Sequence, residues 1–166
     1  MQLTGKTAVV GIFGDPVQHS LSPRMQNAAI KANGLDAVYV PFHVTPTQLS
    51  DAVAGMRAMA LRGVNLTIPH KEAACCLVDE LDEQAALIGA INTIVNHEGH
   101  LKGYNTDGIG LLTAVKRELG IHKLLRASDL LEDPEDRSPV DDHHRLQFRF
   151  GQASNKWLLN LEQRGR

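Results

Sequence analysis

Lys71 and Asp107 are the residues whose types and positions best fit proton-transfer chemistry in this 166-residue chain. Lys71 ends the segment 65–71 (Asn-Leu-Thr-Ile-Pro-His-Lys), and Asp107 lies in the segment 103–108 (Gly-Tyr-Asn-Thr-Asp-Gly). Each segment closes a strand-like run and opens a helix-like one, and in an α/β fold such junctions lie at the strand ends where ligands bind. A lysine and an aspartate that converge there can move a proton, so we predict that they act together.

The position of Lys71 itself favours a functional role. The pattern predicts a helix over 71–78, which places Lys71 in its first turn. The helix dipole disfavours an exposed cation there by ~0.3–1 kcal/mol. An ammonium held in such a place can serve as an acid or a base. A solvated surface lysine is the structural alternative, and this segment alone does not decide between them.

Ser20 and Ser22 lie within a turn-rich segment, residues 11–23, between a predicted strand and a predicted helix. The helix end supplies partial positive charge and free N–H groups, and the hydroxyls can orient a ligand. We therefore predict a site suited to a carboxylate. The alternative is that Ser22 is only the helix N-cap, followed by proline at the first helical position, and that His19 is only a turn residue.

Other polar side chains follow the same strands. Strand alternation sends Asn65 and Thr67 to the same side, so that an amide and a hydroxyl face one way. Asn92, in the segment 89–93 (Gly-Ala-Ile-Asn-Thr), and Asp107 supply two more groups suited to binding hydroxyls. In structural terms, Asp107 can instead merely favour the first turn of a helix.

Strand and helix patterns alternate along residues 1–121, which predicts an open, mostly parallel α/β sheet with helices on both faces. A turn at Glu98 and Gly99 predicts a hairpin, which adds one antiparallel strand. The predicted strands are 7–13, 37–43, 63–68, 91–97 and 101–104.

The helices between these strands are predicted from caps and apolar stripes. Residues 45–48 (Thr-Pro-Thr-Gln) have the pattern of a capping box, residues 82–88 form a further helix, and Thr106 is expected to cap a last helix that ends at Gly120. The stripe of the first helix is Met25, Ala28, Ala29 and Ala32, and that of the second is Leu49, Val53, Met56 and Ala60.

Composition narrows the classes of function. A hydrophobic share of 43%, a net charge of -2 and a pI near 6.4 give no electrostatic case for nucleic acid or an anionic membrane, and we expect neither partner. The start of the chain lacks the pattern of a secretory signal. Cys75 and Cys76 are adjacent, which predicts free thiols in a reducing cytoplasm, and without a spaced Cys/His set we expect no metal.

The amino-acid composition of the chain changes after Ile121. Charged residues are about twice as frequent from His122 onward as before it. Residues 132–139 have the profile of a disordered linker, and we expect 125–139 to be mobile. The predicted division is therefore a domain over 1–121 and a divergent, partly disordered and poorly structured C-terminal tail over 122–166.

Four segments in a fixed order give the chain a family resemblance. They are 19–23 (His-Ser-Leu-Ser-Pro), 65–71, 89–93 and 105–108 (Asn-Thr-Asp-Gly). Together they closely resemble the N-terminal, substrate-binding half of shikimate dehydrogenase, over about residues 6–121. The resemblance implies an NADP-dependent reduction of 3-dehydroshikimate to shikimate, in the cytoplasmic pathway to chorismate and the aromatic amino acids.

The resemblance also implies roles for individual residues. The positions of Ser20 and Ser22 hold the substrate carboxylate in the family, and those of Lys71 and Asp107 form the catalytic pair. The ring hydroxyls are held by the positions of Asn65, Thr67, Asn92 and Asp107. Shikimate and quinate both remain open as ligands.

Departures from the family pattern shape the expected activity. Gln26 stands where the family commonly has histidine, a change we expect to be tolerated. From His122 onward the sequence has no glycine-rich turn for the NADP pyrophosphate. Residues 108–110 (Gly-Ile-Gly) weakly resemble a dinucleotide-binding loop, but Thr113 stands at the position of its third glycine. We therefore expect no cofactor-binding residues. A frameshift, a deletion or a gene-prediction join near Ile121 is our hypothesis for the divergent sequence from His122 onward.

These expectations leave three functional hypotheses. The chain is a truncated shikimate dehydrogenase that is inactive alone. Alternatively, it is a non-catalytic shikimate-binding module or subunit that needs a separate cofactor-binding chain. The third hypothesis is an inert remnant. A homodimer is compatible with the first two.

Overall fold

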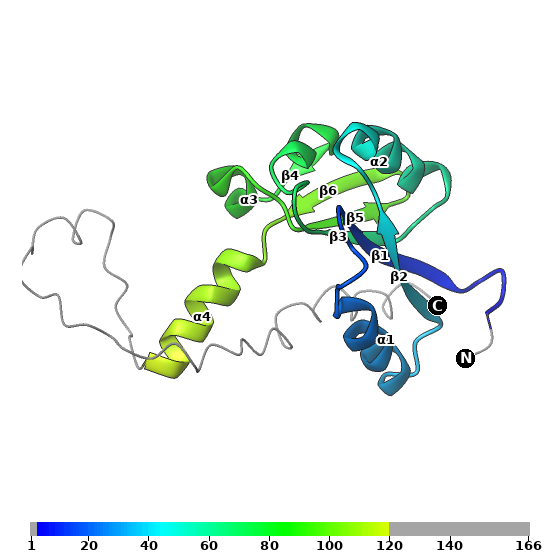
Figure 1. Ribbon diagram of the computed structural model, residues 1–166, viewed down its shortest axis with the longest axis horizontal. Helices are drawn as coiled ribbons and strands as arrows, with labels where there is room; N and C mark the ends of the chain where they lie inside the picture. The colour runs from blue at the N-terminus through cyan, green and yellow to red at the C-terminus, as the bar shows by residue number, and fades with distance from the viewer. Residues whose placement is uncertain (1–2, 120–166) are drawn as a thin grey trace, which may run out of the picture.

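A six-stranded sheet forms the centre of the computed structural model, which describes residues 3–119 (Figure 1). The strand order across the sheet is β2-β1-β3-β5-β6-β4. β1, β2 and β3 run parallel, β5 runs antiparallel to both of its neighbours, and β4 is parallel to β6. The predicted α/β sheet with one antiparallel strand is confirmed. The strands are β1 Ala8–Gly14, β2 Ala37–His43, β3 Gly63–Leu66, β4 Glu80–Leu81, β5 Thr93–His97 and β6 His100–Tyr104.

Helices cover both faces of this sheet, as the sequence predicts (Figure 1). α1 lies against one face and α2 against the other, and α4 extends away from the sheet. The 3-10 helix η2 packs in the same core as α2. None of the helices in residues 3–119 has the length and apolar character needed to cross a membrane. The helices are α1 Ser22–Ala32, η1 Pro46–Gln48, α2 Leu49–Ala58, η2 Ala73–Leu77, α3 Glu83–Ile88 and α4 Asp107–Leu119.

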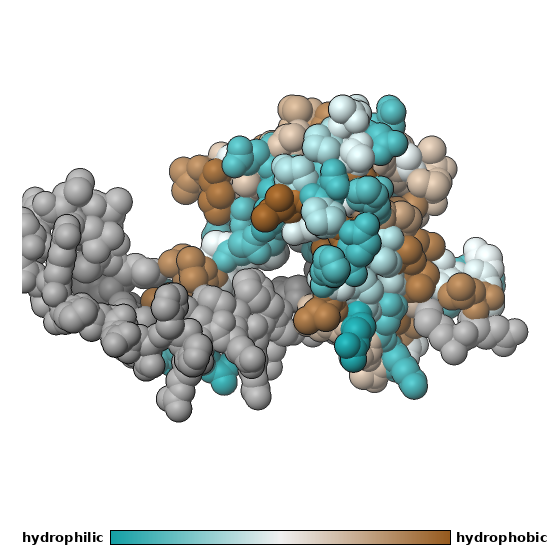
Figure 2. Space-filling view, in the orientation of Figure 1, coloured by the Kyte–Doolittle hydropathy of each residue, from teal (hydrophilic) through white to brown (hydrophobic). Residues whose placement is uncertain are grey.

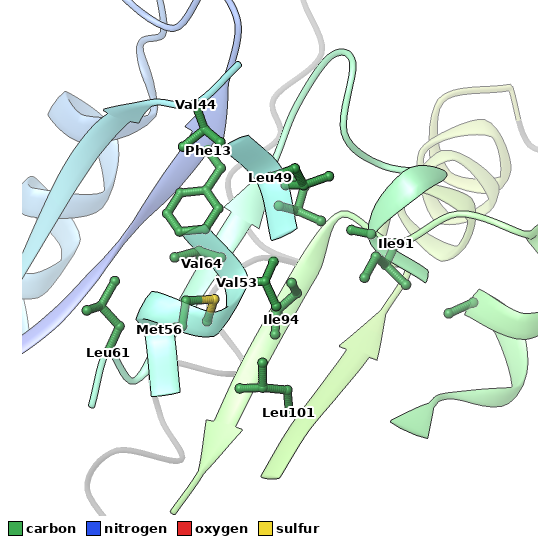
Figure 3. Packing of buried hydrophobic residues seen from close by; sticks show 13 residues of the cluster. Phe13, Val44, Leu49, Val53, Met56, Leu61, Val64, Ile91, Ile94 and Leu101 are labelled. Atoms are coloured by element: carbon green, nitrogen blue, oxygen red, sulfur yellow. The ribbon is translucent and has the colours of Figure 1, made fainter. Parts of the chain in front are cut away.

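Two apolar cores follow from this layering, one on each side of β1. Val10 and Ile12 point to the α1 side, where they pack with Ile30, whereas Phe13 points to the α2 side. The larger core lies beneath α2 (Figure 3), and the α2 residues that the sequence assigns to its apolar stripe are at most 3% exposed there. These residues are Leu49, Val53 and Met56.

The first predicted stripe is wrong, because α1 is rotated by a polar contact. Met25 is 41% exposed, whereas Gln26 and Ile30 are buried. The side chain of Asn27 accepts from the backbone N–H of Tyr39 at 2.9 Å and donates to its carbonyl at 2.9 Å. This amide pairs with the free edge of β2 as another strand would, and so it sets which face of α1 meets the sheet.

Several predicted helix ends also differ. Thr45 does not cap a helix, because its hydroxyl donates to the Gln48 side chain at 2.9 Å and residues 46–48 form η1 ahead of α2. Ala60 lies beyond the end of α2, at φ 51. The predicted helix 71–78 is the shorter 3-10 helix η2, so Lys71 precedes it and the dipole argument for that position fails.

Other local predictions are confirmed. β5 and β6 form the predicted hairpin, and its turn residues Glu98 and Gly99 both have positive φ, at 54 and 96, as a tight hairpin turn requires. Asp82 caps α3 by accepting from the N–H of Ala85 at 2.8 Å.

Asp79 connects α2 to the hairpin. Its carboxylate accepts from both terminal nitrogens of Arg57, at 2.7 and 3.1 Å, and from the N–H of Leu101 at 2.7 Å. The Arg57 hydrogen bonds, followed by the Leu101 N–H, lower the pKa of Asp79 from 3.8 to about 2. A carboxylate with a depressed pKa stabilises the fold above the pKa of the unfolded chain, and this contribution disappears as the pH falls through the folded value.

We expect Asp79→Asn to remove this pH-dependent contribution. Wild type should be the more stable protein near neutral pH, and the difference in urea midpoint should shrink between about pH 4 and pH 2. Asp51→Asn, at an exposed position of α2, is the matched control. If the difference in urea midpoint between wild type and Asp79→Asn is the same at about pH 4 and about pH 2, the interpretation is contradicted.

Candidate active site

The side chains of Lys71 and Asp107 meet, as their positions in the sequence predict. Lys71 Nζ donates to Asp107 Oδ2 at 2.6 Å, and the two side chains are 36% and 42% exposed. Lys71 comes from the loop that follows β3, and Asp107 is the first residue of α4, which follows β6. The pair is half open to solvent, so its ionic attraction is partly screened. It therefore remains accessible to a ligand.

Asn92 fixes the carboxylate of this pair. Its Nδ2 donates to Asp107 Oδ1 at 2.7 Å and to Thr106 Oγ1 at 2.8 Å, and its Oδ1 accepts from the Thr106 N–H at 3.0 Å. Asn92 is 8% exposed, so these contacts satisfy an amide that is nearly removed from water. The first turn of α4 is thereby attached to the residue that precedes β5.

The start of α4 is capped by Asn105, and the predicted cap by Thr106 is wrong. Asn105 Oδ1 accepts from the N–H groups of Asp107 at 3.0 Å and Gly108 at 3.2 Å, while the Thr106 hydroxyl turns to Asn92. The reason is the competing amide of Asn92, which offers Thr106 two hydrogen bonds. The first two N–H groups of this helix are therefore already satisfied within the protein.

Asn65 and Thr67, which the sequence places on one side of β3 and its extension, have different surroundings. Asn65 Nδ2 donates to Thr93 Oγ1 at 3.1 Å, across the β3/β5 pair in which these residues are partners. β3 ends at Leu66, so Thr67 lies just beyond it. A Cβ on Gly14 would lie 2.4 Å from the Thr67 methyl group, so only glycine fits at that position of β1.

Ser20 and Ser22, which the sequence predicts as carboxylate contacts, lie at the start of α1. The Ser22 N–H donates to Ser20 Oγ at 3.3 Å. Leu21 occupies the N-cap position without a side-chain cap, so the alternative in which Ser22 serves only as N-cap is wrong. The Ser22 hydroxyl is therefore not used to cap α1, and an 11-residue helix begins beside it.

Tyr39 is a site residue that sequence reasoning missed. Its hydroxyl donates to Asn65 Oδ1 at 2.8 Å. Burial raises its pKa well above the ordinary value for tyrosine, and the side chain of Ser22 interacts with the same phenol and partly offsets this rise. The sequence does contain a signal for this role. Tyr39 and Ala37 lie on the same side of a predicted strand, and a tyrosine hydroxyl that is buried needs a hydrogen-bond partner.

Cys75 and Cys76 carry free thiols, as the sequence predicts. The Cys75 thiol donates to the carbonyl of Lys71 at 3.6 Å, and burial raises its pKa. This interaction attaches η2 to the loop that presents Lys71. In residues 3–119 no group of three or more His, Cys, Asp or Glu side chains is arranged to hold a metal ion.

Apolar surface borders the site on the α3 and α4 side. Figure 2 shows hydrophobic patches in the region of α3 and at the start of α4. Leu87 is 89% exposed, Ile88 is 49% exposed and Ile109 is 47% exposed. Ile88 lies next to Gly108, where a Cβ would come within 3.1 Å of its Cδ1.

Comparison with known proteins places this arrangement in a class and a family. The family model described as the shikimate dehydrogenase substrate binding domain matches residues 12–94. The NADP(+) shikimate dehydrogenase of Citrifermentans bemidjiense is 55% identical over 122 residues, which are 74% of this chain and 42% of that protein.

Two solved structures give the same result. A shikimate dehydrogenase in complex with NADP+ is 48% identical with a TM-score of 0.69, covering 72% of this chain and 42% of that one. The Listeria monocytogenes shikimate 5-dehydrogenase in complex with shikimate and NAD is 44% identical with a TM-score of 0.68, covering 71% and 41%.

The fold and the matched segment define an α/β substrate-binding domain. The chain belongs to the shikimate dehydrogenase family, as its motifs indicate. It spans about 42% of the length of the curated relative from Citrifermentans bemidjiense. The proposed boundary at residue 121, the expected mobility of 125–139 and the tail over 122–166 lie outside the described residues.

We expect Asn92→Ala to destabilise the domain by about 1–3 kcal/mol, because it removes the amide that hydrogen-bonds to the buried Thr93 hydroxyl and the partly buried Thr106 hydroxyl. Urea denaturation of both proteins measures this loss. Asn33→Ala removes an exposed amide that donates to the Ala29 carbonyl, and it should cost less. An equal cost for the two variants would show that Asn92 does not hold the site together.

Proposed function

We propose that this chain is the substrate-binding part of a shikimate dehydrogenase, an enzyme of the shikimate pathway that reduces 3-dehydroshikimate to shikimate with NADP. The observation that carries the proposal is the contact of 2.6 Å between Lys71 and Asp107, held by Asn92, within a chain of this family. The relative from Citrifermentans bemidjiense is named an NADP(+) enzyme.

In this proposal Lys71 and Asp107 are the catalytic residues. Reduction of a carbonyl places negative charge on its oxygen, and an ammonium beside that oxygen can neutralise or protonate it. Lys71 is the ammonium, and its contact with Asp107 fixes the position of Nζ. The Asp107 carboxylate, itself fixed by Asn92, then orients Lys71 and accepts a hydrogen bond from a ring hydroxyl of the ligand.

The remaining substrate contacts divide between the two ends of the site. Ser20 and Ser22 bind the ligand carboxylate, and this assignment is supported by a Ser22 hydroxyl that does not cap α1 and by the N-terminus of α1. The ring hydroxyls are assigned to Asn65, Thr67, Asn92 and Asp107. The strands that carry these residues are neighbours in the sheet, because α1 follows β1, Asn65 lies in β3, Asn92 precedes β5 and α4 follows β6. This order supports a ligand that carries a carboxylate at one end and hydroxyls at the other.

The described residues do not fit NADP. A dinucleotide needs glycines and free N–H groups at a helix N-terminus. The only glycine pair at a helix start in residues 3–119 is Gly108 and Gly110 of α4, and there the Asn105 side chain accepts from the N–H of Gly108, while Asp107 adds negative charge. We therefore assign no cofactor-binding residue.

A second candidate function is a shikimate-binding module or subunit that works with a separate cofactor-binding chain. The occupied N-terminus of α4 favours it over independent catalysis. In either case the proposed ligand is a small molecule and the proposed location is the cytoplasm, in keeping with the free thiols of Cys75 and Cys76.

We expect the purified 166-residue chain to show neither saturable NADPH binding nor dehydrogenase turnover. The reason is that neither residues 3–119 nor the sequence of 120–166 offers a glycine-rich strand-turn-helix unit. NADPH fluorescence titration and the absorbance of NADPH with 3-dehydroshikimate measure the two properties. The full-length relative from Citrifermentans bemidjiense is the positive control. Saturable cofactor binding by this chain would contradict the assignment.

We also expect shikimate binding to depend on Ser22 more than on Lys71. Carboxylate capture acts in the ground state, whereas Lys71 acts mainly on charge that develops during reduction. Affinity should be no better than about millimolar, near -4 kcal/mol. Ligand-observed NMR on Ser22→Ala and Lys71→Ala tests the order, with Ser50→Ala at an exposed position of α2 as the control. Loss of binding in Lys71→Ala with retention in Ser22→Ala would reverse the roles.

A further inference from the structure

Tyr39 is held in place at both its backbone and its side chain. It is 2% exposed, although it lies in β2, an edge strand of the sheet. The Asn27 amide fixes its backbone through two hydrogen bonds of 2.9 Å each. A side chain so anchored has little freedom, so the direction of its hydroxyl is set by the fold rather than by a ligand.

The Tyr39 hydroxyl reaches a residue two strands away. β2 and β3 are separated by β1, where Tyr39 pairs with Val10 and Asn65 pairs with Ile12. The phenol therefore lies across β1 on the α1 side, and its hydroxyl donates to Asn65 Oδ1 at 2.8 Å. Because burial raises the pKa of Tyr39, the hydroxyl keeps the proton that this hydrogen bond requires.

The orientation of the Asn65 amide matters for the site. Its Nδ2 faces the carbonyl of Asn92 at 3.4 Å and Thr93 Oγ1 at 3.1 Å, and a carbonyl can only accept. The Thr93 hydroxyl in turn donates to Asn92 Oδ1 at 3.1 Å. One network thus runs from Tyr39 through Asn65 and Thr93 to Asn92, which fixes the carboxylate of Asp107.

Tyr39 is also connected to the opposite end of the site, because Asn27 of α1, the helix that begins at Ser22, holds the Tyr39 backbone. Resting on the proposed function, we propose that Tyr39 is a positioning residue that orients the Asn65 amide and sets its place relative to Ser22. Tyr39 thereby links the carboxylate contact at the start of α1 to the hydroxyl contacts on β3 and α4. It acts through Asn65 and does not itself take part in the reaction.

A measurement without ligand tests the positioning role directly. Tyr39→Phe preserves the ring volume and removes only the hydroxyl. The 1H-15N resonances of the Asn65 side-chain amide should shift, and its N–H groups should exchange faster with solvent. The amide of Asn27 should be unchanged, because it contacts only the Tyr39 backbone. An unchanged Asn65 amide in a folded Tyr39→Phe protein would overturn the proposal.

A double-mutant cycle on shikimate binding tests the consequence for the ligand. Tyr39→Phe should weaken binding by about five- to tenfold, the usual worth of one hydrogen bond. The same substitution in an Asn65→Ala background should have no further effect. Tyr104→Phe, at the other tyrosine of the chain, is the matched control and should bind like wild type. If Tyr39→Phe weakens shikimate binding as much in the Asn65→Ala background as in wild type, Tyr39 does not act through Asn65 and the proposal is overturned.

The two measurements separate this proposal from the proposed function. If the folded wild type does not bind shikimate, the proposed function fails, and the Asn65 amide resonance still decides whether Tyr39 positions Asn65.

Discussion

The hydrogen bonds of Asn92 to Asp107 and Thr106 are the contacts on which the candidate site depends. α4 extends away from the sheet (Figure 1), and its apolar side chains Ile109, Leu111 and Leu112 are exposed. The position of its first residue is therefore set by polar contacts rather than by a core. Without Asn92, Asp107 would be directed only by its ion pair with Lys71, and a half-exposed ion pair fixes geometry weakly.

Asparagine amides solve the same problem elsewhere in the domain. A loop or edge strand leaves backbone groups without ladder partners, and one amide can satisfy both a donor and an acceptor. Asn27 does this at the free edge of β2, and Asn105 at the start of α4. Buried Asn96 donates to the carbonyl of Leu61 at 2.9 Å and accepts from the N–H of Gly99 at 2.7 Å. The amides give loops a defined geometry that apolar packing alone would not supply.

Local sequence signals predicted the elements well where one face is apolar and the ends carry specific residues. The α2 stripe of Leu49, Val53 and Met56 is buried, and Asp82 caps α3. Predictions failed where a distant polar group competes with the local pattern. Met25 of α1 is exposed because Asn27 pairs with β2. The Thr106 side chain does not cap α4, because it hydrogen-bonds to Asn92 instead. Such partners are far apart in the sequence, so periodicity does not reveal them.

The sequence by itself determined the family, the alternation of strands and helices, and the residue types that the site contains, because these are recorded in short ordered motifs and in local periodicity. The tertiary structure alone decided which side chains meet. Lys71 and Asp107 are 36 residues apart, and Tyr39 and Asn65 are 26 residues apart. Their contacts follow from the strand order β2-β1-β3-β5-β6-β4, which carries these residues to neighbouring positions through pairings that no local pattern specifies.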